Sequence, residues 1–256
     1  MKTFCFTVDD NIRFLKELTE GKYNSIFDHP YLALYRRLHE RYGLKVQLNL
    51  FYRTEGFDLS LMTEAYYDEF LENSDWLKMS FHSELENVRP YAFAPYEEVY
   101  WDCKRVHNEV ARFASPSALA RTTTLHYCVA TAGGVKALED LGVSGLLGLF
   151  GTDEAPRVSY QVDEASAARI RRGEAVKLGA VTYSAIDAIL NNFSREEILA
   201  RLASRLDRPH LKVMIHEQYF YPDYPKHQPD FEEKLKATFD YLTSNGYQSA
   251  FFEELL

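Results

Sequence analysis

The chain has 256 residues, of which 46% are hydrophobic and 26% charged, a globular composition that excludes a disordered or fibrous protein. The net charge of −9, with no window that gathers lysine and arginine, argues against a nucleic-acid partner. No stretch approaches the roughly 18 to 20 uncharged apolar residues that span a bilayer, so no membrane role is expected.

The N-terminus and the cysteines indicate a cytoplasmic protein. The first residues lack the apolar segment and the small-residue cleavage site of a secretory signal. Cys5, Cys103 and Cys128 are odd in number and lack metal-type spacing, which argues against a disulfide framework or a thiolate zinc site. We therefore expect small buried thiols in a reducing compartment.

Strand-like and helix-like segments alternate along the chain. Runs rich in apolar, β-branched or aromatic residues predict strands at 3–8, 44–51, 76–81, 119–125, 143–150, 176–183, 211–215 and 248–252. Segments with helical spacing lie between them, at 11–20, 31–41, 62–72, 96–113, 131–141, 195–206 and 229–244. Residues 151–179 lack clear periodicity and predict a surface excursion with a short helix over 165–172. Continuous alternation without a linker predicts one α/β domain over residues 1–256, closed into a parallel barrel.

Two adjacent acids, Asp9 and Asp10, follow the first predicted strand. In a parallel barrel the loops after the strands form the open face, so residues at strand ends are candidates for chemistry. Adjacent carboxylates repel each other unless they share a cation or divide their roles. One acid can bind a metal while the other acts as a base, or Asp10 or Asn11 can simply cap the next helix.

Imidazoles and carboxylates follow other predicted strands as well. His82 and Glu86 are four residues apart and would share one cation on a helical turn, although Ser83-x-x-Glu86 is equally a capping box. His216 and Glu217 follow the run at 211–215. Several such strand ends together indicate a functional site.

His126 and Tyr127 follow the run at 119–125, where a lone histidine is more often a hydrogen-bonded structural residue. Aromatic residues, among them Tyr219, fill the segments 89–96 and 218–224 beside presumed strand ends. Such rings either offer flat faces to a sugar or pack over the barrel rim.

The residues at these strand ends resemble the polysaccharide deacetylase superfamily, the metal-dependent carbohydrate esterases of family 4. Thr7-Val8-Asp9-Asp10 matches the family's Thr-Phe-Asp-Asp type motif. The segment His82-Ser83-Glu84-Leu85-Glu86 is similar to its His-Ser/Thr-x-x-His motif, with Glu86 in place of the last histidine. Val213-Met214-Ile215-His216 is similar to its Leu-x-x-His motif, and residues 134–142 are similar to the helix after its third motif.

The resemblance implies a distorted (β/α)7 barrel with one divalent metal. By position, Asp10, His82 and Glu86 would be the metal ligands, Asp9 the general base and His216 the general acid. One imidazole and two carboxylates make a hard site, in which zinc is expected first and manganese, iron or cobalt become more competitive.

Two motifs of the family are poorly represented. Arg121 and Tyr127 stand near the place of its Arg-x-x-Pro-Tyr motif without the proline, and only Asp153 and Asp187 could replace its Asp-x-x-Asp-Trp motif.

The resemblance predicts a hydrolase that uses metal-activated water to remove an acyl group from an N- or O-acylated sugar, either a small molecule or an oligosaccharide. The alternatives are a degenerate barrel that binds carbohydrate without turnover and a barrel hydrolase of non-sugar amides. No oligomeric state is predicted. The predicted substrate contacts are Arg121, His126, Tyr127, Glu217 and Tyr219.

Overall fold

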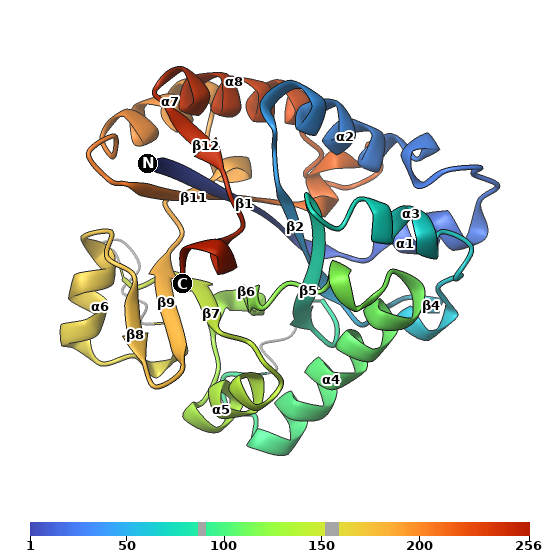
Figure 1. The fold of residues 1–256 in the computed structure, drawn as a ribbon, viewed down its shortest axis with the longest axis horizontal. Coiled ribbons are helices and arrows are strands. Elements are labelled where there is room, and N and C mark those ends of the chain that lie inside the picture. The colour runs from blue at the N-terminus through green and yellow to red at the C-terminus, as the bar shows by residue number, and fades with distance from the viewer. Residues whose placement is uncertain (87–90, 152–158) are drawn as a thin grey trace.

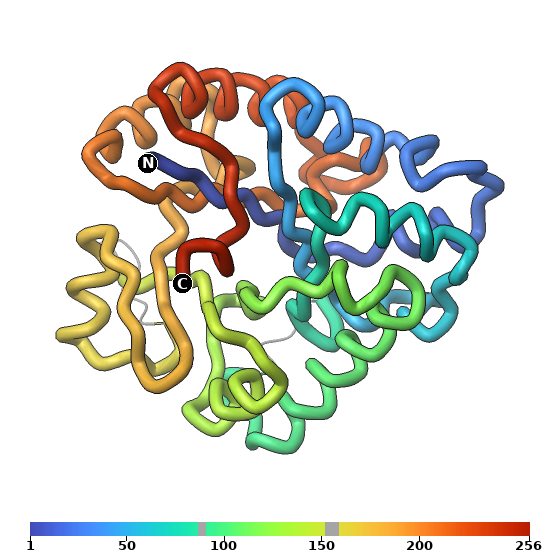
Figure 2. The backbone as a smooth tube through the Cα atoms, in the orientation of Figure 1, coloured from blue at the N-terminus to red at the C-terminus, as the bar shows by residue number. Residues whose placement is uncertain are grey.

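The computed structural model describes residues 1–86, 91–151 and 159–256, and its centre consists of parallel strands covered by helices (Figure 1). Strand β1 (Lys2–Asn11) pairs with β11 (His210–His216) on one side and with β2 (Val46–Phe51) on the other. Strand β2 continues to β5 (Leu77–Ser83), and all of these pairs are parallel. The first residues of β1 also pair with β12 (Tyr247–Ser249), and both ends of the chain lie in the left half of the view in Figure 2.

A second sheet completes the ring of strands. It contains β6 (Thr122–Thr123), β7 (Gly145–Gly148), β9 (Val181–Ala185) and β8 (Val176–Leu178). A parallel bridge between Met79 and Leu119 joins β5 to the segment before β6. At the other edge, residues 181–189 pair with β7 through β9 and with β11 through β10 (Ala188–Ile189). The parallel pairings therefore run around a ring, and the predicted α/β barrel is confirmed.

Alternation along the strands decides which side chains face the helices. Phe4 and Phe6 of β1 pack on Phe239 of α8, and Phe6 also contacts Tyr35 of α2, so the intervening residues face the barrel interior. The covering helices are α1 (Arg13–Glu20), α2 (Pro30–Tyr42), α3 (Tyr67–Glu72), α4 (Tyr96–Phe113), α5 (Ala132–Asp140), α6 (Glu164–Arg171), α7 (Arg195–Ala203) and α8 (Phe231–Ser244).

Short elements fill the connections between strands and helices. The hairpin of β3 (Arg53–Thr54) and β4 (Phe57–Asp58) follows β2. Single turns of 3-10 helix are η1 (Ile26–Asp28), η2 (Leu59–Leu61), η3 (Pro116–Ala118), η4 (His126–Cys128), η5 (Ser159–Gln161), η6 (Leu190–Asn192), η7 (Glu217–Phe220) and η8 (Phe252–Leu255).

Caps mark several helix ends, and one predicted strand is wrong. Ser194 and Glu197 form a capping box at the start of α7, and Gly246 follows α8 with a positive φ of 80°. The single strand predicted at 176–183 is instead the antiparallel hairpin β8–β9, because Gly179 turns the chain at φ 64°. Among the described residues, no helix is long and apolar enough to cross a membrane.

Candidate metal centre

A bulge at the end of β1 brings two consecutive carboxylates to the open face of the barrel. Val8 pairs with Leu48 and Asn11 with Leu50, so the register shifts at Asp9 and Asp10. A regular strand would point these side chains to opposite faces. Asp10 instead has a φ of 63°, a left-handed conformation that aspartate tolerates better than most residues.

Asn11 holds this bulge in place. Its side-chain Nδ2 donates to the carbonyl oxygens of Val8 at 2.6 Å and Asn49 at 3.2 Å, and its Oδ1 accepts a hydrogen bond from the Tyr31 hydroxyl at 2.7 Å. All of these groups are buried, so the backbone strain at Asp10 is balanced by a complete set of hydrogen bonds. Asn11 therefore positions the two acids and does not cap the next helix.

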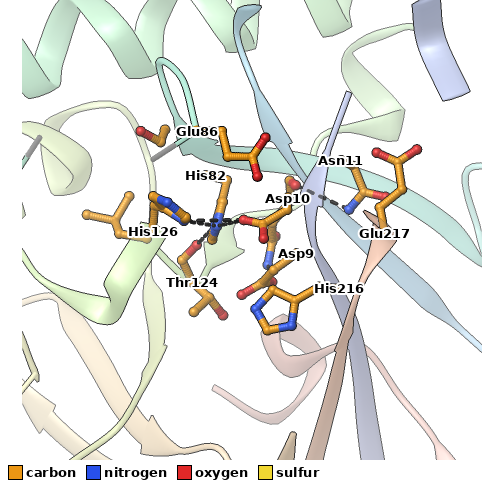
Figure 3. Close-up of polar contacts among 12 residues, drawn as sticks. Asp9, Asp10, Asn11, His82, Glu86, Thr124, His126, His216 and Glu217 are labelled. Atoms are coloured by element: carbon orange, nitrogen blue, oxygen red, sulfur yellow. Dashed lines mark hydrogen bonds and ion pairs between the residues drawn. The ribbon is translucent and has the colours of Figure 1, made fainter. Parts of the chain in front are cut away.

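Asp10, His82 and His126 each bring one atom of a kind that binds metals to the same place at the open end of the barrel (Figure 3). The Oδ1 atom of Asp10 lies 3.0 Å from His82 Nε2 and 3.2 Å from His126 Nδ1. The two imidazole nitrogens are 3.2 Å apart. His82 lies on β5 and His126 follows β6, so neighbouring strand ends supply all three side chains.

The hydrogen bonds of His82 determine which of its nitrogens faces this triangle. Its Nδ1 is 2.5 Å from the Thr124 carbonyl, which can only accept, so Nδ1 carries a hydrogen. In the neutral ring Nε2 then presents a lone pair toward Asp10. Burial disfavours the charged ring, yet the carboxylates of Asp9 and Asp10 outweigh it and raise the pKa of His82.

The triangle fits a divalent cation. Lone pairs that face each other at such distances require a proton or a cation between them. Zinc bonds of about 2.0 to 2.2 Å place neighbouring ligand atoms roughly 3.0 to 3.5 Å apart, the separation of these three atoms. Two imidazoles and one carboxylate, with a carbonyl behind one imidazole, form a donor set typical of catalytic zinc. His126, and not Glu86, supplies the third atom of this set.

Asp9 lies beside the triangle and is almost completely buried. Its Oδ1 accepts a hydrogen bond from Asn49 Nδ2 at 2.7 Å, and Asn49 Oδ1 in turn accepts one from Gln47 Nε2 at 2.8 Å. Burial raises the pKa of the Asp9 carboxyl, and the neighbouring His82 and His216 offset this only in part. Asp9 is therefore a stronger base than an exposed aspartate.

His216 pairs with Asp9 across β11 and β1, and Figure 3 shows the two side chains next to each other. The Nδ1 atom of His216 is 2.8 Å from Asn191 Oδ1, a contact that fixes the ring and uses Nδ1 rather than Nε2. Asn191 follows β10. The sequence analysis predicted no strand at β10, so the contact between Asn191 and His216 was not expected. Asp187 and Asp153 were the two acids that could replace the Asp-x-x-Asp-Trp motif. Asp187 instead forms an ion pair with Arg208, and Asp153 lies outside the described residues.

These groups open into one cavity of about 360 Å³, a volume typical of small-ligand sites. Tyr127 and Tyr219 line it, and the Tyr127 ring lies 4.2 Å from that of His126, centroid to centroid. The cavity also contains Asp9, Asp10, His82, Glu86, His126, Asn191, His216, Gln218, Tyr224 and Lys226.

No protein-family model matches the sequence, and no curated protein matches it. Solved structures do match. A pseudoenzyme of carbohydrate esterase family 4 from Bacillus anthracis has a TM-score of 0.54 at 11% identity, over 99% of this chain and 65% of the length of that one. A family 4 acetyl xylan esterase from Clostridium thermocellum, in complex with a cobalt ion, has a TM-score of 0.56 at 10% identity, over 99% of this chain and 90% of that one. The chain has the fold of the family 4 carbohydrate esterases.

This esterase fold is not confined to esterases. A 4-alpha-glucanotransferase from Thermococcus litoralis has a TM-score of 0.59 at 14% identity, over 99% of this chain and 40% of that one. Identities this low define the architecture alone, so the chemistry has to be argued from the side chains.

Two of the predicted substrate contacts, Arg121 and Glu217, do not line the cavity that contains Asp10. Arg121 precedes β6, at the end of the barrel opposite Asp10, where it lines a different hollow with Lys78 and Glu253. Glu217 is buried and points away from the triangle (Figure 3). We therefore withdraw both as substrate contacts, because the sequence indicated neither the strand boundary nor the direction of the side chain.

Glu217 instead holds the start of α1. Its carboxylate accepts hydrogen bonds from the backbone N–H groups of Ile12, Arg13 and Phe14 at 2.7, 3.1 and 2.8 Å, and from the Tyr221 hydroxyl at 2.9 Å. A carboxylate suits the positive end of a helix.

Glu86 is held at the rim of the cavity. Gln218 Nε2 donates one hydrogen bond to Asp10 Oδ2 at 2.9 Å and one to Glu86 Oε1 at 3.1 Å. The capping box that was the alternative for Ser83 and Glu86 does not form, because Ser83 remains in β5 and its hydroxyl donates to the Leu85 carbonyl.

Proposed function

We propose that the protein is a metal-dependent hydrolase that removes an acyl group from an N- or O-acylated sugar. The observation that carries the proposal is the triangle of Asp10, His82 and His126, which shares a cavity with the buried acid Asp9 and the imidazole of His216. A ligand set, a base and an acid within one small cavity are the parts that hydrolysis of an amide or ester needs.

Asp10, His82 and His126 would hold the ion, and a bound divalent cation supplies Lewis acidity toward water and the acyl carbonyl. Asp9 takes up a proton from the attacking water, a role for which its raised pKa prepares it. The Nε2 atom of His216 gives a proton to the departing amine or alkoxide, while Asn191 keeps Nδ1 occupied. Without that proton an amine is a poor leaving group, so the acid matters more for amides than for esters.

Zinc is the metal we propose, with cobalt, iron and manganese as further possibilities. Replacing the expected Glu86 by His126 gives the site two nitrogen donors and one oxygen, which favours zinc more than the carboxylate-rich set expected from the sequence. The sugar substrate is supported by the aromatic rings of Tyr127, Tyr219 and Tyr224 around the cavity, because flat rings with polar edges suit sugar faces. The three free, buried cysteines support a cytoplasmic location.

The test is acetate release from N-acetylated amino-sugar oligomers and from acetylated xylan, with simple amides as the competing substrates. Protein stripped with a chelator should lose activity and regain it with about one equivalent of zinc or cobalt. Asp9→Asn should keep the metal and lose turnover by about a hundredfold or more, whereas Glu55→Gln, at an exposed position, should change neither. Acetate release that is indifferent to the metal would contradict the proposal, and preference for simple amides would favour a non-sugar substrate.

The contact between His216 and Asn191 favours a second function, the binding of an acylated sugar without turnover. The hydrogen-bond partner of His216 is the neutral Asn191, which stabilises a charged imidazole less than a carboxylate does. Acid catalysis is therefore weakened at this position, as expected of a barrel that binds an acylated sugar without turning it over. Tight sugar binding by the metal-loaded protein, with no acetate released from any substrate, would select this function.

A further inference from the structure

We propose that Glu86 selects substrates that carry an ammonium group beside the acylated unit, as in a partly deacetylated amino-sugar oligomer. This inference rests on the proposed function, because it names the substrate class of the same cavity. Glu86 is not one of the three residues of the metal triangle, and the inference gives it a role in substrate specificity.

Glu86 lies where three hollows meet. It lines the catalytic cavity, a second hollow of about 230 Å³ beside Arg13 and Tyr221, and a third of about 430 Å³ beside Arg53 and Glu55. Figure 3 shows it on the far side of Asp10 from Asp9 and His216. A substrate longer than one sugar unit whose acyl group reaches those two residues can extend past Glu86 into either outer hollow.

The Glu86 carboxylate is fixed in place, and no cation among the described residues neutralises its charge. Both hydrogens of the Gln218 amide are used, one on Asp10 and one on Glu86, so the side chain is held at a set position relative to the metal ligands. No ion pair joins Glu86 to a described cation, and the arginines of the two outer hollows are engaged elsewhere. Arg13 pairs with Glu17 and Asp223, and Arg53 pairs with Glu84.

This arrangement favours a cation on the ligand. A half-buried carboxylate whose described partner is one neutral amide gains from a charged donor, and hydrogen bonds to charged groups are the stronger kind. An acetamido group at the same place offers only a neutral N–H donor and a carbonyl that the carboxylate repels. A tetrahedral ammonium with three donors matches the lone pairs that remain on Glu86.

The experiment compares two dimers of glucosamine, one with a single N-acetyl group on one unit and one acetylated on both. The metal-loaded wild type should favour the singly acetylated dimer in kcat/KM by about tenfold, the size of one partly exposed charge-assisted contact. Glu86→Gln keeps the shape and the bond to Gln218 and should abolish this preference. Glu233→Gln, the same loss of charge at an exposed position of α8 outside the three hollows, should leave the preference intact. Metal content should be equal in all three proteins.

Binding of the fully deacetylated dimer, measured by calorimetry, separates this inference from the proposed function. If no dimer is hydrolysed but the deacetylated dimer binds about tenfold more tightly to the wild type than to Glu86→Gln, the specificity role stands and hydrolysis is refuted. If hydrolysis occurs with equal preference in both proteins, the specificity role is overturned and the enzyme stands. If Glu86→Gln loses the metal, Glu86 is a ligand and the inference is overturned.

Discussion

The assignment of His126 as a metal ligand can be tested by replacing it with alanine. His126 supplies one of three atoms that lie 3.0 to 3.2 Å from one another around a common point. Loss of residues that merely support a ligand costs about 10- to 100-fold in metal affinity, so loss of a direct ligand should cost at least about 100-fold. That factor corresponds to roughly 2.7 kcal/mol of binding free energy.

The assay is a competition titration of zinc against a chromophoric chelator, with metal content checked by elemental analysis. His216→Ala is the matched control, because it removes an imidazole from the same cavity without touching the triangle, and it should bind zinc as the wild type does. A melting curve confirms that each variant is folded. Undiminished zinc affinity in His126→Ala, together with its loss in Glu86→Gln, would show that the ligand set expected from the sequence was right and that the geometric argument is wrong.

Other consequences concern pH, proton donation and stability. The metal-free protein should melt at a lower temperature as pH rises above about 6.5, because the pKa of His82 is raised in the fold. The stabilisation from the charged ring is complete below the unfolded value of about 6.5 and is lost as pH rises through the folded value. Saturating zinc should remove this decline, and a metal-free melting temperature that does not change with pH would contradict the charge assignment. Asn191→Asp should increase amide turnover severalfold, since a hydrogen bond from the ring of His216 to a carboxylate is stronger than one to a neutral amide; unchanged amide turnover in folded protein would exclude Asn191 as the residue that orients the acid. Glu217→Gln should lower the free energy of unfolding by about 2 kcal/mol without changing KM, because the amide turns a donor toward backbone N–H groups; urea titration measures the first quantity, and a raised KM in folded protein would restore Glu217 as a substrate contact.

Hydrophobic periodicity was sufficient to predict the alternation of strands and helices. The segment 96–113 matches α4, and the predicted ends of the other helices lie close to the observed ones, apart from α3, which starts at Tyr67. The strands were identified by continuous apolar runs, because both faces of a barrel strand are buried. Where a glycine with positive φ turns the chain, as at Gly179, the run of apolar residues continues and hides the hairpin.

The candidate site was predicted in part. Asp9, Asp10, His82 and His216 lie in one cavity, as their positions at strand ends indicated. Glu86 was expected to be the third ligand because it stands where the similar His-Ser/Thr-x-x-His motif has its last histidine, four residues after His82. The chain continues as a strand through Ser83, and the third ligand atom comes from the neighbouring strand end at His126.

The sequence by itself determined which strand ends carry acids and imidazoles, because each apolar run and the polar residues that follow it are adjacent in the chain. Only the tertiary structure decided which of them meet. The bulge at Asp10 reverses the alternation that would separate it from Asp9, and the closing of the ring sets His126 against His82 across 44 residues of sequence. Both depend on pairing between distant segments, and such pairing leaves no period in the sequence.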